Sequence, residues 1–335
     1  MSASSFDIHP DMRELLDAKQ AAKQAEAAND ARGGWNNYAA AMQRDYPPGM
    51  TVTNTTLPCG IAGVAQDAPA RIYRFADAPT PSPCVIYIHG GAFIKGSLDS
   101  GDPIAWGIAD ATRWTVISID YRLAPEHPFP CGVEDCCAAI QHILRQAAQL
   151  GIDPQRIALW GDSAGGNMAA ASCLIARDRG APSVAATVLV YPCLTDDLSA
   201  PAYRTFAHAP VPTASMDRAW SLYLGDRRPT QDPYAAPLKA TSLRSLPPTF
   251  VHIAEIDCLA DDGRAYVEKL RAAGTPAELR VAQRMIHGFL RARFTGPAAA
   301  AEFRVPCDFL RGLFKDEGRN SLSAGRQTAG EKAPA

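Results

Sequence analysis

Six short apolar runs recur along the chain, and most neighbouring runs are separated by enough residues to form a helix. The runs cover residues 84–88, 115–119, 156–160, 186–191, 249–254 and 277–282. Short, continuous apolar runs rich in β-branched residues are typical of strands that are buried on both faces. The pattern therefore predicts a group of parallel strands at the centre of the protein.

Helical stretches lie between these runs, at residues 133–150, 164–179 and 261–273. Gly180 and Gly274 follow two of them, at the position where glycine commonly ends a helix. Upstream, residues 51–57 and 70–76 alternate weakly between apolar and polar and predict two antiparallel strands. Together these patterns predict an α/β fold: a mostly parallel eight-stranded sheet flanked by helices on both faces.

Three segments depart from this rhythm. Residues 9–31 carry a narrow apolar stripe, so we expect a helix that ends at Gly33–Gly34 and lies over another part of the protein. Residues 195–245 are rich in Pro, Ala, Tyr and Trp and predict an insert over the carboxyl edge of the sheet, with a helix near 215–224. The polar tail, 316–335, is expected to be disordered.

Composition narrows the range of partners. The 335 residues are 47% apolar, and 35 acidic residues against 33 basic ones give a net charge of −2. This balance gives no electrostatic reason to expect a nucleic acid or an anionic membrane as partner. The first residues show no signal-peptide pattern, and the nine cysteines form no C-x-x-C pair. We therefore expect a cytoplasmic protein with free thiols, without a metal site or a membrane-spanning helix.

The strongest chemical signal is a serine placed between a strand and a helix. Residues 156–167 read RIALWGDSAGGN, which places Ser163 in a G-x-S-x-G motif. A turn this tight strains the serine backbone, and side chains at Gly161 or Gly165 would clash. The serine hydroxyl is thus raised above the sheet at a helix N-terminus, which predicts a nucleophile. The alternative is a glycine-rich turn in which Ser163 only caps the helix.

A serine hydroxyl needs a base to become a good nucleophile, and in this topology the base follows the serine in the chain. Three histidines lie downstream of Ser163. His208 falls in the insert, and His252 falls inside an apolar strand, where its neighbours would be core groups. His287 follows the strand at 277–282 and is next to a glycine, so we predict that His287 is the base.

An acid that orients the histidine should come from the end of another strand. Asp257 ends the strand sequence TFVHIAEID, which places its carboxylate at the same sheet edge as Ser163. Asp261 and Asp262 are the alternatives, but they open the next helix and fit the role of N-terminal caps better. We therefore predict Asp257 as the acid.

Backbone amides that stabilise an oxyanion are expected where a buried strand ends in small residues. The strand at 84–88 is followed by His89, Gly90, Gly91 and Ala92. The amides of Gly91 and Ala92 are the candidate donors, Gly90 shapes the turn, and the amide of Ala164 is the third candidate. His89 precedes the serine and ends a strand, so we expect it to hold the glycine turn by hydrogen bonds.

Five segments together resemble the hormone-sensitive-lipase-like esterases (bacterial family IV) of the α/β-hydrolase fold. They are HGGAF at 89–93, DYRLAPEHPFP at 120–130, GDSAGGN at 161–167, EIDCLADDG at 255–263 and MIHGF at 285–289. The resemblance covers about residues 70–316 and implies that Ser163, Asp257 and His287 form a catalytic triad. It also implies a carboxylesterase that acts on short acyl esters without a cofactor and is often a dimer.

The resemblance further implies a helical cap over a hydrolase core. The cap would consist of N-terminal helices within residues 1–50 and the insert at 195–245. The core would then comprise residues 51–194 and 246–315. Within the core, Tyr121, Arg122 and Glu126 are expected to brace the oxyanion turn as a polar network rather than to react with substrate.

One departure from the family pattern concerns the oxyanion turn. The family's HGGG is HGGA here, and Ala92 would be strained if this position needs a positive φ. The alanine still carries an amide donor, while its Cβ would narrow the space beside the oxyanion. We therefore expect activity to be kept, with an effect on bulky substrates.

Aromatic residues from both predicted cap segments and from the core are candidates for the substrate pocket. They are Phe93, Tyr191, Tyr203, Phe206 and Trp220, together with Trp35 and Tyr38, although each could instead pack the cap. Such a pocket favours short or compact acyl esters. The alternatives are an amidase, a carbamate hydrolase or an acyltransferase with the same triad. A non-catalytic receptor is disfavoured because His287 is present, and a nucleotide-binding protein because G-x-G-x-x-G is missing.

Overall fold

A computed structural model describes residues 6–25, 31–59 and 66–315 of the chain. Its described part contains one sheet of eight strands in the order β1-β2-β4-β3-β5-β6-β7-β8. The strands are β1 (Met50–Cys59), β2 (Gln66–Phe75), β3 (Ser82–Ile88), β4 (Thr115–Ile119), β5 (Ile152–Asp162), β6 (Ala186–Val190), β7 (Thr249–Ile256) and β8 (Ala277–Ile286). Each predicted strand is present. The apolar runs in β3, β4, β5, β6 and β7 are buried, whereas the run at 277–282 lies in the edge strand β8 and is mostly part-exposed or exposed.

The sheet is parallel from β4 to β8 and antiparallel at its other edge. β1 pairs with β2, and β2 with β4, in antiparallel register. At the centre, Ile86 of β3 pairs with Ile117 of β4 on one side and with Leu159 of β5 on the other. Parallel strands carry their carboxyl ends to one edge, so the loops after β3, β5, β7 and β8 lie close together.

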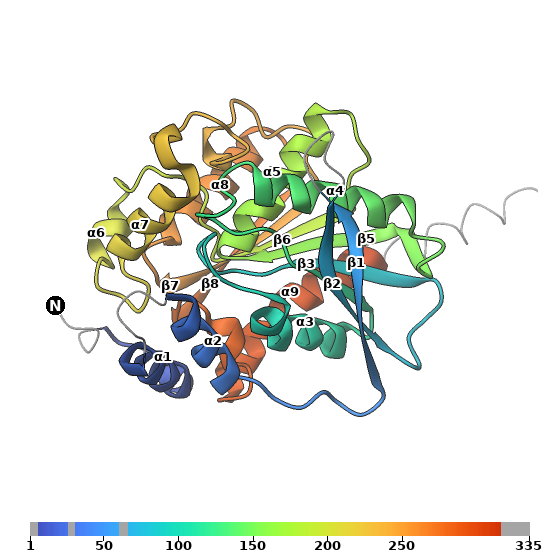
Figure 1. The fold of residues 1–335 in the computed structure, drawn as a ribbon, viewed down its shortest axis with the longest axis horizontal. Helices are drawn as coiled ribbons and strands as arrows, with labels where there is room; N and C mark the ends of the chain where they lie inside the picture. Colours follow the sequence, from blue (N-terminus) through green and yellow to red (C-terminus); the bar gives the residue numbers. More distant parts are fainter. Residues whose placement is uncertain (1–5, 26–30, 60–65, 316–335) are drawn as a thin grey trace, which may run out of the picture.

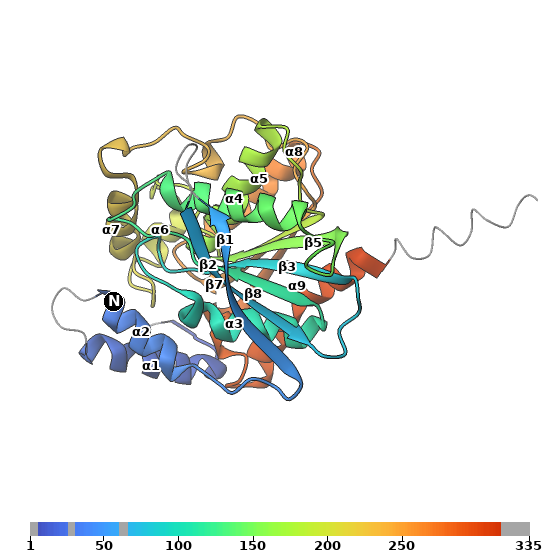
Figure 2. The same ribbon diagram turned by 45° about the vertical axis from the view of Figure 1, so that its right-hand side comes forward.

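Helices cover both faces of the sheet, as Figures 1 and 2 show. The helices are α1 (Arg13–Ala25), α2 (Ala31–Ala41), α3 (Leu98–Thr112), α4 (Cys131–Arg145), α5 (Ala164–Asp178), α6 (Pro201–Thr205), α7 (Thr213–Leu224), α8 (Ala260–Ala272) and α9 (Pro297–Lys315). Short 3₁₀ turns are η2 (Pro10–Met12), η3 (Gly225–Arg227), η4 (Pro237–Lys239) and η5 (Phe289–Ala292). α4, α5 and α8 pack on one face, while α3 and α9 pack on the other. The predicted α/β-hydrolase architecture is confirmed.

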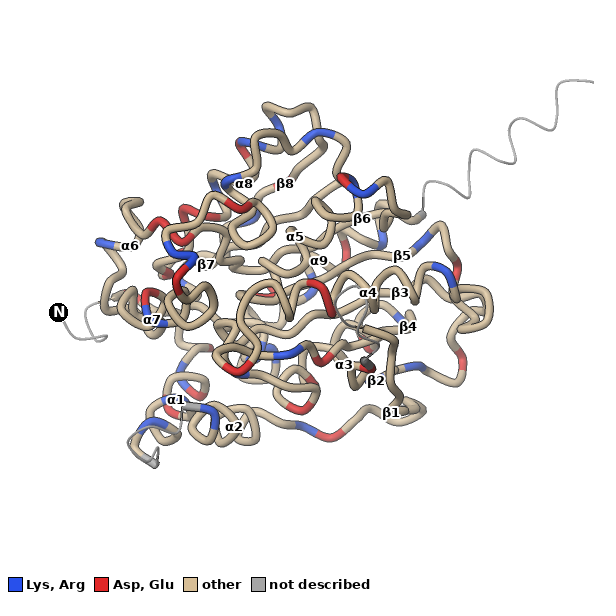
Figure 3. Tube along the Cα trace, turned by 45° about the horizontal axis from the view of Figure 1, so that its top comes forward, with Lys and Arg blue, Asp and Glu red and all other residues tan. Residues whose placement is uncertain are grey.

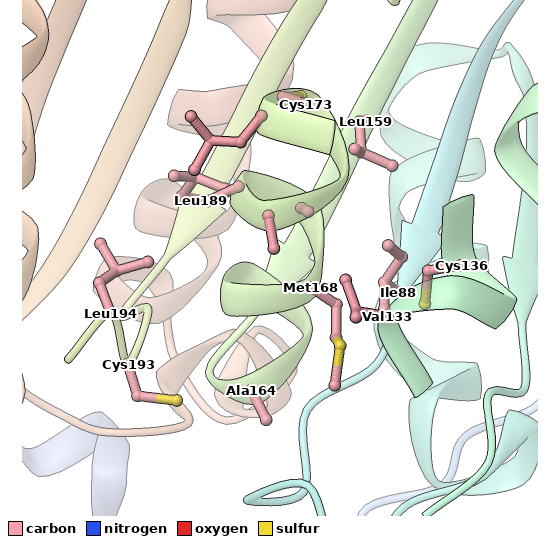
Figure 4. Close-up of a cluster of buried hydrophobic side chains, with 14 of the residues drawn as sticks. Ile88, Val133, Cys136, Leu159, Ala164, Met168, Cys173, Leu189, Cys193 and Leu194 are labelled. Atoms are coloured by element: carbon pink, nitrogen blue, oxygen red, sulfur yellow. The ribbon is translucent and has the colours of Figure 1, made fainter. Parts of the chain in front are cut away.

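α5 connects the reactive edge of the sheet to the core. Figure 4 shows Met168 of α5 beside Val133 of α4, in the apolar cluster that also contains Ile88 of β3. Cys136, Cys173 and Cys193 are labelled in the same cluster. Burial raises the pKa of the Cys173 thiol to about 11, so it stays protonated and packs as a small apolar group. The nine cysteines are free thiols, as the sequence predicts.

Two helices differ from the sequence-based expectation. Gly33–Gly34 does not end the first helix but lies inside α2, which continues to Ala41. The side chain of Arg32 holds this helix by donating to the carbonyls of Ile94 at 2.8 Å and Ala124 at 3.1 Å. Tertiary contacts thus outweigh the low helix propensity of glycine. α3 was not predicted because Gly101, Pro103 and Gly107 interrupt its pattern.

The glycines of α3 lie where neighbouring side chains pack closely against the helix. A Cβ on Gly101 would lie 3.0 Å from the Cβ of His89, and one on Gly107 would lie 2.3 Å from the guanidinium carbon of Arg293. A sequence signal for the start of α3 does exist. Ser97 and Ser100 form a reciprocal capping box at its first turn.

The N-terminal segment lies on residues that come near the end of the chain, as its narrow apolar stripe suggests. Asp7 pairs with Arg284 at 2.5 Å, and the Asp11 carboxylate accepts from the amides of Ala298 at 2.8 Å and Ala299 at 3.0 Å. Met12 is fully buried. Residues 7–12 are therefore held in place by residues 284–299.

The insert is attached to the core through the first turn of α8. The Asp261 carboxylate accepts from the amide of Ala202 at 2.8 Å, and the Asp262 carboxylate accepts from the amide of Leu194 at 2.8 Å and the hydroxyl of Tyr203 at 3.1 Å. The expectation that both residues cap their own helix is wrong, because α8 has no side-chain cap bond. Instead, they connect α8 to residues 194–203. The division into cap and core stays a prediction.

Charged residues of both signs are distributed over the described part of the chain. Basic and acidic residues are interspersed along the trace in Figure 3, in keeping with the near-neutral net charge. Within the ranges that the structure covers, no helix combines the length and apolar character needed to cross a bilayer. The tail at 316–335, which the sequence predicts to be disordered, lies outside the described residues.

Candidate active site

The turn from β5 to α5 has the strained geometry that its glycines predict. Ser163 has φ 56° and ψ −119°, which is rare for a residue with a side chain. A Cβ on Gly161 would lie 2.1 Å from the carbonyl oxygen of Gly165, and one on Gly165 would lie 2.0 Å from that of Ile88. Both positions therefore exclude any larger residue. The Ser163 hydroxyl makes no capping bond to α5, so it is available at the edge of the sheet.

Ser163, His287 and Asp257 come together from three different loops. The Oγ of Ser163 lies 2.9 Å from Nε2 of His287, and Nδ1 of His287 lies 2.7 Å from Oδ2 of Asp257. The other carboxylate oxygen of Asp257 accepts from the amide of Leu259 at 3.1 Å. Asp257 is 1% exposed, Ser163 7% and His287 8%, so solvent reaches the hydroxyl–imidazole end more than the carboxylate. This geometry allows proton transfer from serine to histidine.

His252, which the sequence places in a strand, makes contacts that hold the fold together. His252 is fully buried in β7, and its Nε2 lies 2.9 Å from Oε2 of Glu302. Glu302 also pairs with Arg280 at 2.6 Å. Burial lowers the pKa of His252, with Glu302 opposing that change. His252 thus links the sheet to α9 and does not reach Ser163.

The backbone amides of the oxyanion turn differ in whether a protein acceptor already binds them. The Gly90 amide donates to Oδ1 of Asp162 at 2.9 Å, so it is already used, which agrees with a shaping role. Within the described residues, the amides of Gly91 and Ala92 donate to no protein acceptor. Ala164 is the first residue of α5, where an amide has no acceptor inside the helix. These three amides are the available donors near Ser163.

Ala92, which replaces the third glycine of the family's HGGG, has a positive φ. Its φ is 55°, and the φ of Phe93 is 66°, so two residues with side chains have left-handed backbone in this turn. Gly91, with φ 145°, is required on different grounds. A Cβ there would lie 1.8 Å from the carbonyl oxygen of Lys95.

His89 and the segment after β4 hold this turn in place. Nδ1 of His89 lies 3.0 Å from the carbonyl oxygen of Gly90, and Nε2 lies 3.2 Å from Oδ1 of Asp120. The ring of Tyr121 stacks on that of His89 at 4.5 Å, and its hydroxyl donates to the His89 carbonyl at 3.0 Å. The hydrogen-bonding role expected for His89 is therefore what the structure shows.

Arg122 and Glu126 make separate contacts rather than one network. Arg122 forms a two-pronged pair with Asp135, with both bonds at 2.7 Å. Glu126 pairs with Arg32 of α2 at 2.6 Å. The first pair fixes the loop after β4 to α4, and the second fixes it to the N-terminal helices.

Five of the candidate pocket aromatics, Phe93, Trp220, Tyr203, Tyr191 and Phe206, fall into four environments. Phe93 stacks on Tyr223 at 4.0 Å and packs against Trp220 at 4.9 Å, and all three are buried. Tyr203 is also buried, with its hydroxyl on Asp262. The remaining two differ: the Tyr191 ring lies 4.5 Å from the His287 ring, while Phe206 is partly exposed and packs on Phe6 at 5.7 Å. Their role in binding substrate stays a prediction.

Sequence reasoning missed several groups beside the site. Oδ1 of Asp162 accepts from the hydroxyl of Tyr87 at 2.7 Å as well as from Gly90, which joins the two reactive turns. The ammonium group of Lys19 in α1 donates to the carbonyl of His287 at 3.0 Å, and Arg291 is buried nearby. Asp162 could have been found from its place in the motif. Lys19 could not, because it lies far from His287 in the chain.

Residues 85–291 match the family described as having the alpha/beta hydrolase fold, and the chain belongs to this family. Among its relatives is a carboxylesterase, NlhH, of Mycobacterium tuberculosis, which is 41% identical over 244 residues that cover 70% of this chain and 75% of the relative. The esterase LipI of the same organism is 39% identical over 71% of this chain and 78% of its own length.

Solved structures agree with this assignment. A bacterial heroin esterase superposes with a TM-score of 0.80 at 32% identity, covering 91% of this chain and 99% of that protein. An α/β-hydrolase enzyme from the metagenome of Lake Arreo, Spain, gives 0.82 at 33% identity, over 92% and 98%. The predicted resemblance to hormone-sensitive-lipase-like esterases and the predicted class, carboxylic ester hydrolase, are thereby confirmed.

Proposed function

We propose that the protein is a serine carboxylesterase that hydrolyses short or compact acyl esters through an acyl-enzyme. The observation that carries this proposal is the continuous chain of contacts from Ser163 through His287 to Asp257, at 2.9 Å and 2.7 Å. The carboxylesterase and esterase names of its relatives support the same reaction.

In the proposed first half-reaction, Ser163 attacks the ester carbonyl while His287 takes the hydroxyl proton. Asp257 holds the imidazole in the tautomer that presents Nε2 to the serine, and it stabilises the imidazolium. The amides of Gly91, Ala92 and Ala164 stabilise the negative oxygen of the tetrahedral intermediate. The C–O bond then breaks, and His287 gives its proton to the leaving alkoxide.

In the second half-reaction, water replaces the alcohol. His287 takes a proton from the water, the resulting hydroxide attacks the acyl carbonyl, and Ser163 leaves with the proton that His287 returns. The products are the carboxylic acid and the free enzyme. No cofactor takes part in this scheme.

The test is hydrolysis of p-nitrophenyl esters from C2 to C12, with fluorophosphonate labelling of a parallel sample. We expect the highest kcat/KM between C2 and C6 and a label on Ser163. Ser163→Ala should remove the label and lower kcat by at least about 1000-fold with an unchanged circular dichroism spectrum. Ser172→Ala, which removes a hydroxyl from the same helix, is the control and should behave like the wild type.

Two results would change the proposal. Labelling without ester turnover would redirect it to an amide, a carbamate or an acyl-transfer reaction. Higher kcat/KM on the C12 ester than on the C4 ester would contradict the short-chain preference. The homodimer and the cytoplasmic location expected from the sequence stay predictions.

A further inference from the structure

Three positively charged side chains gather around an aromatic pair beside His287. The Trp35 and Tyr38 rings of α2 lie 5.5 Å apart. Lys95 lies 4.9 Å and Arg291 5.3 Å from the Trp35 ring centre, while Lys19 lies 5.6 Å and Arg291 5.8 Å from that of Tyr38. Ring faces attract cations without neutralising them, so these ring contacts leave the positive charges of Lys19 and Arg291 in place.

Carboxylates do not neutralise Lys19 or Arg291 within the described residues. Lys19 donates to the carbonyl of His287 at 3.0 Å, and Arg291 donates to the carbonyl of Ser100. The acids whose charges act on them are Asp257 and Asp162, and each is bound elsewhere. Asp257 holds His287, and Asp162 holds Tyr87 and Gly90.

The same cluster contains buried donors that lack an acceptor. Within the described residues, Nε1 of Trp35, the hydroxyls of Tyr38 and Tyr191, and Nη2 of Arg291 have no hydrogen-bond partner. Tyr38, Tyr191 and Arg291 are at most 3% exposed. Buried polar groups are almost always satisfied, and the indole and guanidinium groups can only donate. What is missing is therefore an acceptor.

The cluster adjoins the proposed reaction centre. From the position that a Cβ on Gly288 would occupy, Nζ of Lys19 is 3.6 Å away and the Tyr38 hydroxyl 3.7 Å. The Tyr191 ring lies 4.5 Å from the His287 ring. Lys19, Lys95 and Trp35 are partly exposed, so the cluster is not sealed from solvent.

We infer that the substrate is an ester that carries a carboxylate, which the cluster of Lys19, Lys95, Arg291, Trp35 and Tyr38 recognises. This inference rests on the proposed esterase function and names its substrate class. A carboxylate supplies both the negative charge and the acceptor oxygens that the cluster lacks. It would reside on the acyl part, as in a dicarboxylic acid monoester, or on the alcohol part, as in an acylated hydroxy acid.

The titration of Lys19 is consistent with an anion beside it. Burial and the charge of Arg291 lower the pKa of Lys19 to about 8, with Lys95 acting in the same direction and Asp257 opposing them. A bound carboxylate would favour the charged form of Lys19 and raise that pKa again.

The test compares matched ester pairs that differ only in a carboxylate or its primary amide. One pair is monoethyl glutarate and its amide, with the group on the acyl side. The other is 3-acetoxypropanoate and its amide, with the group on the alcohol side. In a pH-stat at pH 7, we expect kcat/KM for the carboxylate to exceed that for the amide by about tenfold in at least one pair. The pair that shows the preference identifies the side.

Variants connect the preference to the cluster. Lys19→Met and Lys95→Met should each reduce the ratio of kcat/KM for the carboxylate ester to that for the amide ester several-fold, and Lys19→Arg should keep most of it. Because Lys19 also donates to the carbonyl of His287, this ratio and not the absolute rate is the readout for Lys19→Met. Lys23→Met removes a charge from the same helix at an exposed position and is the matched control. Raising the salt concentration to about 1 M should also weaken the preference, because screening shortens the reach of the lysine charges.

Equal kcat/KM for carboxylate and amide in both pairs would overturn the inference, and this comparison needs no variant to fold. A preference that Lys23→Met lowers as much as Lys19→Met does would overturn it as well. In both cases, turnover of p-nitrophenyl butyrate with labelling of Ser163 would leave the esterase proposal standing. Loss of that turnover and labelling would instead reject the esterase itself.

Discussion

Two tight turns meet at the serine, and they use glycine for different reasons. In the turn after β5, Gly161 and Gly165 leave space for neighbouring backbone, while the strained φ belongs to Ser163. In the turn after β3, glycine is needed at position 91 for both space and a φ of 145°, yet Ala92 has left-handed backbone with a side chain.

A glycine-rich motif can therefore reflect either of two requirements: space for neighbouring backbone, or a left-handed φ. The requirement for space allows no exception, because a Cβ cannot overlap a carbonyl oxygen. A left-handed φ costs a non-glycine residue only about 1–2 kcal/mol. A left-handed φ can thus be tolerated at a residue with a side chain, whereas a Cβ that overlaps neighbouring backbone cannot. This comparison predicts how strongly substitutions in each turn should act.

The largest effect should come from Gly165→Ala. The added Cβ would lie 2.0 Å from the carbonyl oxygen of Ile88, so α5 or β3 must shift. A displacement of this size at the serine should lower kcat by about 100-fold or more. The control is Gly180→Ala, which has φ 61° but no atom near the new Cβ, and steady-state kinetics should show wild-type kcat. A wild-type kcat in Gly165→Ala would contradict the argument from space.

Asp162→Asn should have the next largest effect, because this carboxylate joins the two turns. It accepts from Tyr87 at 2.7 Å and from the Gly90 amide at 2.9 Å. Losing the charge should lower the free energy of unfolding by about 1–3 kcal/mol. Urea unfolding and kcat/KM measure the two consequences, and Tyr87→Phe, which removes one bond, should have the smaller effect. An unchanged unfolding midpoint in Asp162→Asn would show that the turns are held separately.

Asp262→Asn tests a second buried carboxylate, which connects α8 to residues 194–203. Burial raises the pKa of Asp262 to about 8, with the Leu194 amide opposing this change. The folded state therefore binds a proton that the unfolded state has released between about pH 4 and pH 8, so this group makes stability fall as pH rises through that window. We expect the unfolding free energy of Asp262→Asn to fall less than that of the wild type between pH 5 and pH 8. Parallel pH profiles would contradict the prediction.

The smallest effect should come from Ala92→Gly. Glycine relieves the left-handed φ of 55° but loses more conformational entropy on folding, so stability should change by less than about 1 kcal/mol. Removing the Cβ beside the oxyanion should raise kcat/KM for tertiary-alcohol esters relative to ethyl esters. An equal change for both ester types would indicate an altered turn rather than a wider site.

The sequence allowed the sheet to be predicted, and also the meeting of three side chains at its edge, because the pattern that marks each strand is local. Buried strands appear as apolar runs, and Ser163, Asp257 and His287 each follow one of them. The continuation of α2 through Gly33–Gly34 could not be predicted, since the contacts of Arg32 with Ile94 and Ala124 outweigh glycine propensity.

The cationic cluster was not predicted for a similar reason. Lys19 reaches the His287 carbonyl from 268 positions away, and neither residue's neighbours in sequence indicate the contact. Arg291 and Trp35 meet in the same way, through the fold alone. Local patterns thus define the turns, while the cationic cluster depends on long-range packing.

The attachment of the N-terminal segment also affects how the protein matures on the ribosome. Asp7, Asp11 and Lys19 leave the exit tunnel well before their partners Arg284, Ala298 and His287, which are synthesised at least 268 residues later. The strands up to β7 can assemble during translation, whereas α1 must wait for the residues after β8 before it docks. The surroundings of His287 are therefore completed only after residues 284–299 have emerged.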